Sequence, residues 1–158
     1  NLKNDDLYTT KLRVASTVSP EDMIDTILTA MDDYEGSPNP VLYAPRANIT
    51  AMKLIKDELG HRLYKSESEI ADAMGVSSIV AVPVMKNQTN TVNDTTYDLF
   101  GVIVDLRDYD AGTDKGGQVT AFDDFDIDFN QMKYLIETRM SGALSKPRSA
   151  IAIEVMQS

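Results

Sequence analysis

Apolar residues in the first half of the chain recur with the period of a helix. The clearest stripe has apolar residues at positions 23, 24, 27, 28 and 31. Ser19 is suited to cap the start of this helix and Pro20 to occupy its first turn. The segment 36–40, which reads GSPNP, is expected to end it.

Two shorter helices are expected after it. One runs from Asn48 or Thr50 to Glu58, with Gly60 as its C-terminal stop. The other is capped by Ser66 and ends at Gly75. The sequence therefore predicts that the helices lie before residue 76.

After residue 78 the pattern changes to short apolar or alternating segments, which are typical of strands. Two further strands are expected before residue 78. Together, the expected strands cover residues 10–17, 41–44, 78–85, 97–107, 119–129, 132–140 and 150–154. Residues 132–140 fit a strand face or a helix face, and their strand-like neighbours favour a strand. Pro83 places its strand at an edge or at the end of its pairing. These elements predict an α+β fold.

Polar segments predict where the chain turns. Tight turns are expected at Ser141-Gly142 and Lys146-Pro147. Residues 87–96, which are rich in Asn and Thr, are expected to form an exposed loop or the boundary between two lobes. The predicted lobes are residues 1–92, with helices and strands, and residues 93–158, with strands only.

Composition narrows the class of protein. The chain has 158 residues, 42% of them hydrophobic, so it can bury a sizeable core. It has no cysteine, which excludes a disulfide framework, a thiolate metal site and a cysteine nucleophile. No apolar run approaches the roughly 18 residues of a membrane span, and no signal peptide opens the chain. Because the first residue is Asn1 and not Met, we expect the chain to be a piece of something longer.

Charge is unevenly distributed along the chain. The formal net charge of −10 argues against binding to a nucleic-acid backbone, which needs clustered Lys and Arg. Residues 94–128 contain ten aspartates opposed by two cations, whereas residues 129–158 are mildly basic. These segments are either two solvated faces or surfaces through which copies of the chain meet.

One loop resembles a calcium-binding loop. Asp108, Asp110 and Asp114 alternate around Gly112, so their carboxylates could converge on a hard cation. An EF-hand would need Glu at the twelfth position, which is Val119 here. A solvated surface turn is therefore the preferred interpretation.

The sequence gives equally weak support for other catalytic residues. Asp123, Asp124, Asp126 and Asp128 could supply paired carboxylates, yet the alternation around Ile127 is typical of the solvated face of a strand. The only histidine, His61, lies in a polar connection and has no Gly-x-Ser-x-Gly motif beside it. We therefore predict no catalytic residue, no cofactor and no metal site.

A charged strand face is the best candidate for a binding surface. Lys133, Glu137 and Arg139 lie at alternate positions of one expected strand. They either pair across the sheet or contact a neighbouring subunit. With Arg148 from the basic tail, they are the predicted contact residues between copies.

Two longer segments resemble a known family. Residues 122–154 read FDDFDIDFNQMKYLIETRMSGALSKPRSAIAIE, and residues 54–84 read LIKDELGHRLYKSESEIADAMGVSSIVAVPV. The first is similar to the carboxy-terminal end of major capsid proteins of tailed bacteriophages and prophages, in its N-Q-x-K-Y-L-I-E-x-R-x-S-G-A-L pattern, Pro turn and last apolar strand. The second resembles the same family's helix, Gly-x-Arg-Leu-Tyr segment and following helix and strand. The resemblance covers most of residues 19–156.

The resemblance implies the Hong Kong ninety-seven type capsid fold. Residues 1–92 would form an axial-domain-like lobe and residues 93–158 a peripheral-domain-like β region. The implied function is structural and not enzymatic: a fragment of a major capsid subunit that associates with itself into pentamers and hexamers of an icosahedral head. The implied partners are other copies and a scaffolding protein, with no membrane and no specific nucleic acid. The implied location is the virion, with the host cytoplasm during assembly.

The sequence departs from the family in what precedes these segments. The amino-terminal arm, the extended hairpin loop and the long spine helix have no counterpart here, and no residue pair matches the covalent cross-link of some members. Two alternatives stay open. One is a metal-dependent hydrolase that uses the Asp108–Asp114 or Asp123–Asp128 carboxylates, and the other is a non-capsid binding module of a prophage.

Overall fold

The computed structural model describes residues 7–113, 120–126, 131–137 and 140–157. It divides the chain into two compact units. Unit 1 comprises residues 1–108 together with 144–158, and unit 2 comprises residues 109–143. The chain thus leaves unit 1 once and returns to it for its last strand.

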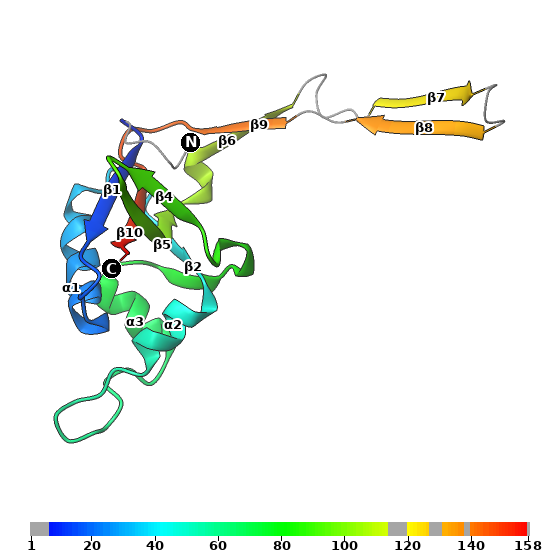
Figure 1. Cartoon of the computed structure of the whole chain (residues 1–158). Helices are drawn as coiled ribbons and strands as arrows, with labels where there is room; N and C mark the ends of the chain where they lie inside the picture. Colours follow the sequence, from blue (N-terminus) through cyan, green and yellow to red (C-terminus); the bar gives the residue numbers. More distant parts are fainter. Residues whose placement is uncertain (1–6, 114–119, 127–130, 138–139, 158) are drawn as a thin grey trace. The chain divides into compact units, whose positions relative to one another are not determined.

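Unit 1 is built on a six-stranded mixed sheet (Figure 1). Its strands are β1 (Thr9–Val14), β2 (Val41–Ala44), β3 (Ser78–Ala81), β4 (Thr89–Val92), β5 (Thr95–Val104) and β10 (Ala150–Met156). The order is β1-β10-β5-β2-β3, with β4 paired to β5 off this path. β1 is parallel to β10 and β2 is parallel to β3, whereas β10, β2 and β4 are antiparallel to β5.

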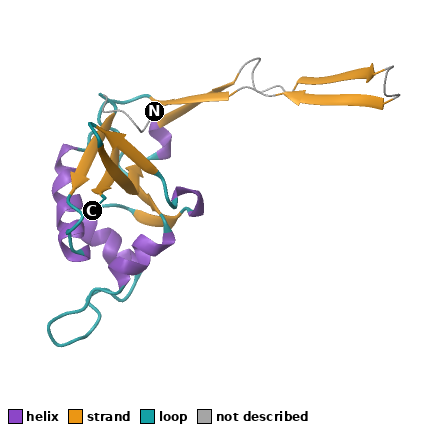
Figure 2. Cartoon of the chain, in the orientation of Figure 1, coloured by secondary structure: helices purple, strands orange, loops and turns teal. Residues whose placement is uncertain are grey.

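Helices cover one face of this sheet (Figure 2). They are α1 (Pro20–Ala30), α2 (Arg46–Lys53) and α3 (Glu67–Met74), with single 3-10 turns at η1 (Met31–Asp33), η2 (Pro83–Met85) and η3 (Leu106–Asp108). The expectation of an α+β fold is confirmed.

Local signals start α1 and α3 and end α3 as expected, whereas α1 ends at Ala30, before the expected stop at residues 36–40. The Ser19 side chain accepts a hydrogen bond from the Asp22 N–H at 3.1 Å, and Pro20 opens α1. Ser66 caps α3 in the same way through the Glu69 N–H. Gly75 ends α3 with φ +73°, a left-handed conformation that favours glycine.

The core lies between the helices and the sheet. Its fully buried side chains include Ile27, Leu42, Met52, Ile70, Met74, Ile103, Ile151 and Ile153. Burying one such side chain stabilises a fold by about 1.5–3 kcal/mol. Gly101 allows this packing, because a Cβ atom at that position would lie 3.0 Å from a Leu42 methyl carbon and from the Tyr43 carbonyl oxygen.

The last strand occupies an interior position in the sheet. β10 lies between β1 and β5, so the two ends of the described chain pair side by side. Its alternation sends Ile151 and Ile153 into the helix-covered core, while Ala150 joins a smaller cluster with Val102 and Val104. The apolar run at the end of the sequence is therefore a buried central strand, as its composition predicts.

The expected second helix differs most from the structure. α2 begins at Arg46 and ends at Lys53, well before Glu58, so the prediction that Gly60 stops it was wrong. The chain after α2 forms a turn, because the Asp57 carboxylate accepts the N–H groups of Leu59 and His61 at 3.0 and 2.8 Å.

Three further predicted segments differ from the structure. The expected strand 78–85 ends at Ala81, because Pro83 starts the 3-10 turn η2. The expected loop 87–96 is instead the hairpin of β4 and β5, whose turn residues Asn93 and Asp94 have φ +49° and +63°. Residues 141–142 continue a strand and do not turn, whereas the turn near Lys146-Pro147 is present.

In its described residues, unit 2 has two pairs of strands. β6 (Tyr109–Thr113) pairs with β9 (Met140–Leu144), and β7 (Thr120–Asp126) is antiparallel to β8 (Gln131–Glu137). The segment 132–140, for which a strand was favoured, therefore begins in β8 and reaches β9. The compact units do not divide at residue 92, because that residue lies in the β4–β5 hairpin of unit 1.

Candidate contact surfaces and the Asp108 network

Two of the predicted contact residues lie on β8 of unit 2. The backbone register pairs Lys133 with Asp124 of β7 and Glu137 with Thr120. Arg139 lies outside the described residues. Contact of these residues with another copy stays a prediction.

The fourth predicted contact residue, Arg148, lies in unit 1. Its guanidinium contacts the Glu35 carboxylate at 3.3 Å, and both side chains are more than half exposed. Its backbone N–H donates to the Leu7 carbonyl at 3.0 Å, and its carbonyl accepts from the Glu35 N–H at 3.0 Å. An exposed ion pair contributes at most about 1 kcal/mol, so the Arg148 head group can change partners at little cost.

A densely bonded polar group of unit 1 is Asp108, where the chain leaves the unit. The Asp108 carboxylate accepts from the Ser37 N–H at 2.5 Å, the Ser37 hydroxyl at 2.6 Å and the Lys146 ammonium at 2.7 Å. The Asp108 carbonyl accepts from the Ser145 N–H at 2.8 Å. We call these four residues the Asp108 network. It ties the point where the chain leaves unit 1 to the segment where it returns.

Burial and hydrogen bonding shift the pKa of Asp108 in opposite directions. Burial alone would raise the pKa of Asp108, but the hydrogen bonds from Lys146 and Ser37 outweigh it and lower the pKa. The network thus holds an ionised carboxylate in a site where its side chain is 1% exposed.

The pKa values of two groups beside the network are also shifted. Hydrogen bonds from Arg107 lower the pKa of Asp105 to about 2. Burial, reinforced by the negative charge of Asp108, raises the pKa of Tyr34 to about 12.

The network was not foreseen from the sequence. Asp108 had been considered as the first ligand of a calcium-type loop with Asp110 and Asp114. In the structure its oxygens face Ser37 and Lys146, Asp110 lies on β6, and Asp114 falls outside the described residues. No short motif links Ser37, Asp108 and Lys146, because each comes from a different part of the chain.

The remaining catalytic candidates are dispersed. Asp123, Asp124 and Asp126 lie along β7, and Asp128 is outside the described residues. The His61 Nδ1 atom lies 3.4 Å from the Asp57 Oδ2 atom, and 76% of the His61 side chain is exposed. Within the described ranges, no three His, Cys, Asp or Glu residues gather where they could hold a metal ion.

A second buried carboxylate, Glu154, holds the strands of unit 1 together. It binds Lys11 at 3.3 Å and Arg13 at 3.1 Å, both from β1, and it accepts from the Asn90 amide of β4 at 3.0 Å. Arg13 also lies over the Tyr97 ring, 5.4 Å from its centroid. Lys11 and Arg13 alternate on one strand, a spacing from which a shared partner could have been inferred.

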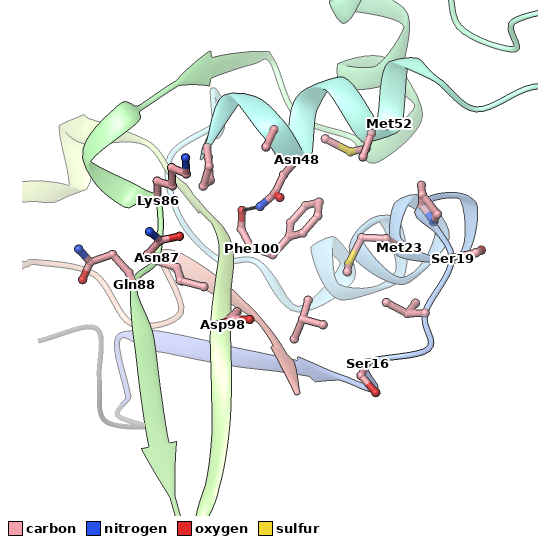
Figure 3. A pocket seen from close by; sticks show the side chains of 17 residues that line it. Ser16, Ser19, Met23, Asn48, Met52, Lys86, Asn87, Gln88, Asp98 and Phe100 are labelled. Atoms are coloured by element: carbon pink, nitrogen blue, oxygen red, sulfur yellow. Dashed lines mark hydrogen bonds between the residues drawn. The ribbon is translucent and has the colours of Figure 1, made fainter. Parts of the chain in front are cut away.

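A pocket of about 420 Å³ opens between α1, α2 and β5 (Figure 3). Met23, Met52 and Phe100 supply apolar surface, and Lys86 and Asp98 are its charged residues. Two of its polar side chains are engaged: Asn48 donates to the Phe100 carbonyl at 2.8 Å, and Asp98 accepts from Gln157 at 2.6 Å. Asp98 is the one carboxylate of this lining, and its side chain already accepts the hydrogen bond from Gln157.

No helix in the described part of the chain is long and apolar enough to cross a membrane.

Comparisons with known proteins give matches by structure but none by sequence. No family model and no curated protein matches the chain. A solved chain described as "Capsid of empty GTA particle computed with C5 symmetry" matches 94% of this chain and 55% of its own length, with 14% identity and a TM-score of 0.62. A chain from Mycobacterium phage Ogopogo matches 92% of this chain and 54% of its own, with 14% identity and a TM-score of 0.57.

A third structure is described as "Capsid structure of the Cyanophage P-SCSP1u". It matches 96% of this chain and 54% of its own length, with 14% identity and a TM-score of 0.52. The chain has the phage capsid fold. It spans just over half the length of the solved chains that it matches. At such low identity the similarity establishes the fold, and the expectation drawn from residues 54–84 and 122–154 is confirmed at that level.

Proposed function

We propose that this chain is part of a major capsid subunit that associates with copies of itself to build an icosahedral phage or prophage head. The observation that carries the proposal is the fold, which matches capsid chains over 94% and 96% of this chain's length. Its function would be association and not catalysis, and it would act in the virion after assembly in the host cytoplasm. A scaffolding protein is a further candidate partner.

The two compact units refine the proposed domains. Unit 1, with its helix-covered sheet, corresponds to the axial-domain-like lobe, and unit 2 corresponds to the peripheral-domain-like β region. Under this assignment the last strand, β10, belongs to the axial-like unit, because it pairs between β1 and β5. A chain that returns to its first unit ties that unit's two ends together.

The proposed contact between copies includes Lys133, Glu137 and Arg139, with Arg148 as a further contact. The acidic residues 94–128 and the basic tail 129–158 support a complementary meeting of unlike surfaces. The exposure of Arg148 supports its availability to a second partner.

Density-gradient sedimentation of the purified full-length gene product tests the proposed function. We expect the wild type to sediment as closed particles, and protein that remains at the top of the gradient at every concentration would contradict the proposal.

The contact residues are tested by charge reversal. The double variant Lys133→Glu, Arg139→Glu is expected to block particle formation and leave folded monomers, as judged by circular dichroism. Lys86→Glu, a reversal at an exposed lysine of unit 1, serves as the control. A normal particle yield from the double variant would exclude these residues as contacts.

The hydrolase alternative has a separate test. Titration of calcium into the gene product by calorimetry is expected to give no heat of binding. Heat that disappears in an Asp110→Asn, Asp124→Asn variant would support a cation site and contradict a purely structural role.

A further inference from the structure

The outer surface of α1 and the turn that follows it is strongly acidic. Between Val14 and Pro45 the sequence contains no Lys or Arg. The acidic residues of this stretch are all exposed: Glu21, Asp22, Asp25, Asp32, Asp33 and Glu35. Leu28 lies among them on α1, with 46% of its surface exposed. We call these seven residues the acidic face.

The next part of unit 1 has the opposite character. From Arg46 to Lys65 there are five Lys or Arg residues against Asp57 and Glu58. Three leucines of this stretch are exposed: Leu54 at 50%, Leu59 at 82% and Leu63 at 46%. We call residues 54–65 the leucine turn. It is basic and apolar at once, which is the complement of the acidic face.

The leucine turn has a defined shape, which reduces the entropy lost when it binds a partner. The Asp57 N–H donates to the His61 carbonyl at 2.8 Å, the Gly60 N–H donates to the Asp57 carbonyl at 2.9 Å, and the Leu63 N–H donates to the Ile55 carbonyl at 3.0 Å. The Asp57 side chain adds the two bonds described above. Figure 1 shows this segment, between α2 and α3, extending away from the helices. A rigid turn with an apolar tip is a favourable anchor.

The leucine turn and the acidic face lie near each other at one end of the unit. Tyr64, at the base of the turn, packs against the core. Burial, followed by the negative charges of Asp25 and Glu21, raises its pKa. Nevertheless the tip does not cover the face within one chain, because Leu59 and Leu28 are both exposed.

We propose that the leucine turn of one copy binds the acidic face of a second copy. Leu59 and Leu63 would cover Leu28, and Lys56, Arg62 and Lys65 would face the carboxylates of α1. The contact joins two different surfaces, so it repeats from copy to copy and closes into a ring when the rotation permits. The inference rests on the proposed function, because it names how self-association occurs in unit 1.

A matched pair of substitutions tests the apolar part. Leu59→Ser and Val84→Ser each replace an exposed apolar residue of unit 1, and only Leu59 lies on the leucine turn; Val84 is 76% exposed. In sedimentation velocity of the full-length gene product, we expect Leu59→Ser to raise the concentration needed for half-assembly at least about tenfold. Val84→Ser is expected to leave it within about twofold. Equal thermal midpoints of the two variants and the wild type would establish that both fold.

A charge exchange tests the electrostatic part. Lys56→Glu, Arg62→Glu and, separately, Glu21→Lys, Asp25→Lys are each expected to prevent assembly. An equimolar mixture of the two variants is expected to restore association into rings with an even number of copies, because the two variants must alternate for each turn to meet a face of opposite charge.

The outcomes separate this inference from the proposed function. Wild-type assembly that neither Leu59→Ser nor the charge reversals reduce would overturn the inference alone. A wild type that never assembles would overturn the proposed function and this inference with it.

Discussion

Asp108 and Asp57 are both aspartates that accept several hydrogen bonds. Asp108 connects segments that are far apart in the sequence, whereas Asp57 connects residues of one turn. Asp108 joins Ser37 and Lys146, which are 71 and 38 positions away in the chain, and its side chain is 1% exposed. The Asp57 side chain accepts from residues two and four positions away, and it is 40% exposed. Loss of the first removes a connection between distant segments, whereas loss of the second changes one turn.

Burial determines what a hydrogen-bonded carboxylate contributes to this fold. A buried hydrogen-bonded carboxylate is costly to leave without its partners, so it contributes to the stability of the whole unit. An exposed one competes with water, so it mainly selects a local conformation. We therefore assign Asp108 to the integrity of unit 1 and Asp57 to the shape of the leucine turn.

The largest effect is expected from Asp108→Ala. Removal of the carboxylate leaves the Ser37 N–H and hydroxyl without their acceptor in a buried site, and we expect a loss of about 3 kcal/mol in the free energy of unfolding. Urea denaturation of the purified protein measures it. Asp57→Ala is the control, and a loss no larger than that of the control would contradict the assignment.

Acid should remove the contribution of Asp108. Its pKa is lowered in the folded state, so the stabilisation is complete above the ordinary aspartate pKa of about 3.9 and is lost as the pH falls through the lower folded value. We expect the difference in unfolding free energy between the wild type and Asp108→Asn to be constant from about pH 5 to pH 8 and to shrink below about pH 4. A difference that does not change with pH would show that the carboxylate charge is unimportant.

A smaller effect is expected from Lys146→Met. The lysine loses a charge-assisted bond to Asp108, but half of its side chain is already in water, so we expect a loss of about 1–2 kcal/mol. Lys56→Met on the leucine turn is the matched control and should change the unfolding free energy by less than about 0.5 kcal/mol. Similar losses in the two variants would contradict the contrast between buried and exposed networks.

The smallest effect on stability is expected from Asp57→Ala, at or below about 1 kcal/mol. Its local effect should be clear, because the Leu59 and His61 amides lose their acceptor. Hydrogen exchange should quicken at these amides and remain unchanged in β10. Faster exchange throughout unit 1 would mean that the leucine turn supports the fold and does not merely present a surface.

Local chemistry explains which elements could be predicted. Ser19 with Pro20, and Ser66 with Gly75, are signals contained within one helix, and they place the start of α1 and both ends of α3 correctly. The end of α2 was misplaced because a side chain outside the helix, that of Asp57, captures the backbone of the following turn. The hairpin at Asn93-Asp94 carried a recognisable turn signal that the polar composition obscured.

Long-range partners could not be derived from the pattern. The alternation of residues 150–154 predicts a strand, but not that it lies between β1 and β5. The Asp108 network combines residues that no periodicity connects. For the contact surface, sequence reasoning selected the charged positions of β8, whereas Leu59 and the acidic face emerge only from exposure in the folded unit.

Electron cryomicroscopy of the purified full-length gene product tests the central claim most directly. We expect closed shells in which unit 1 of each copy meets unit 1 of the next around rings of five and six, with the leucine turn against the acidic face. A monodisperse monomer at every concentration, or an assembly in which this chain does not form the wall, would contradict a role as a capsid subunit.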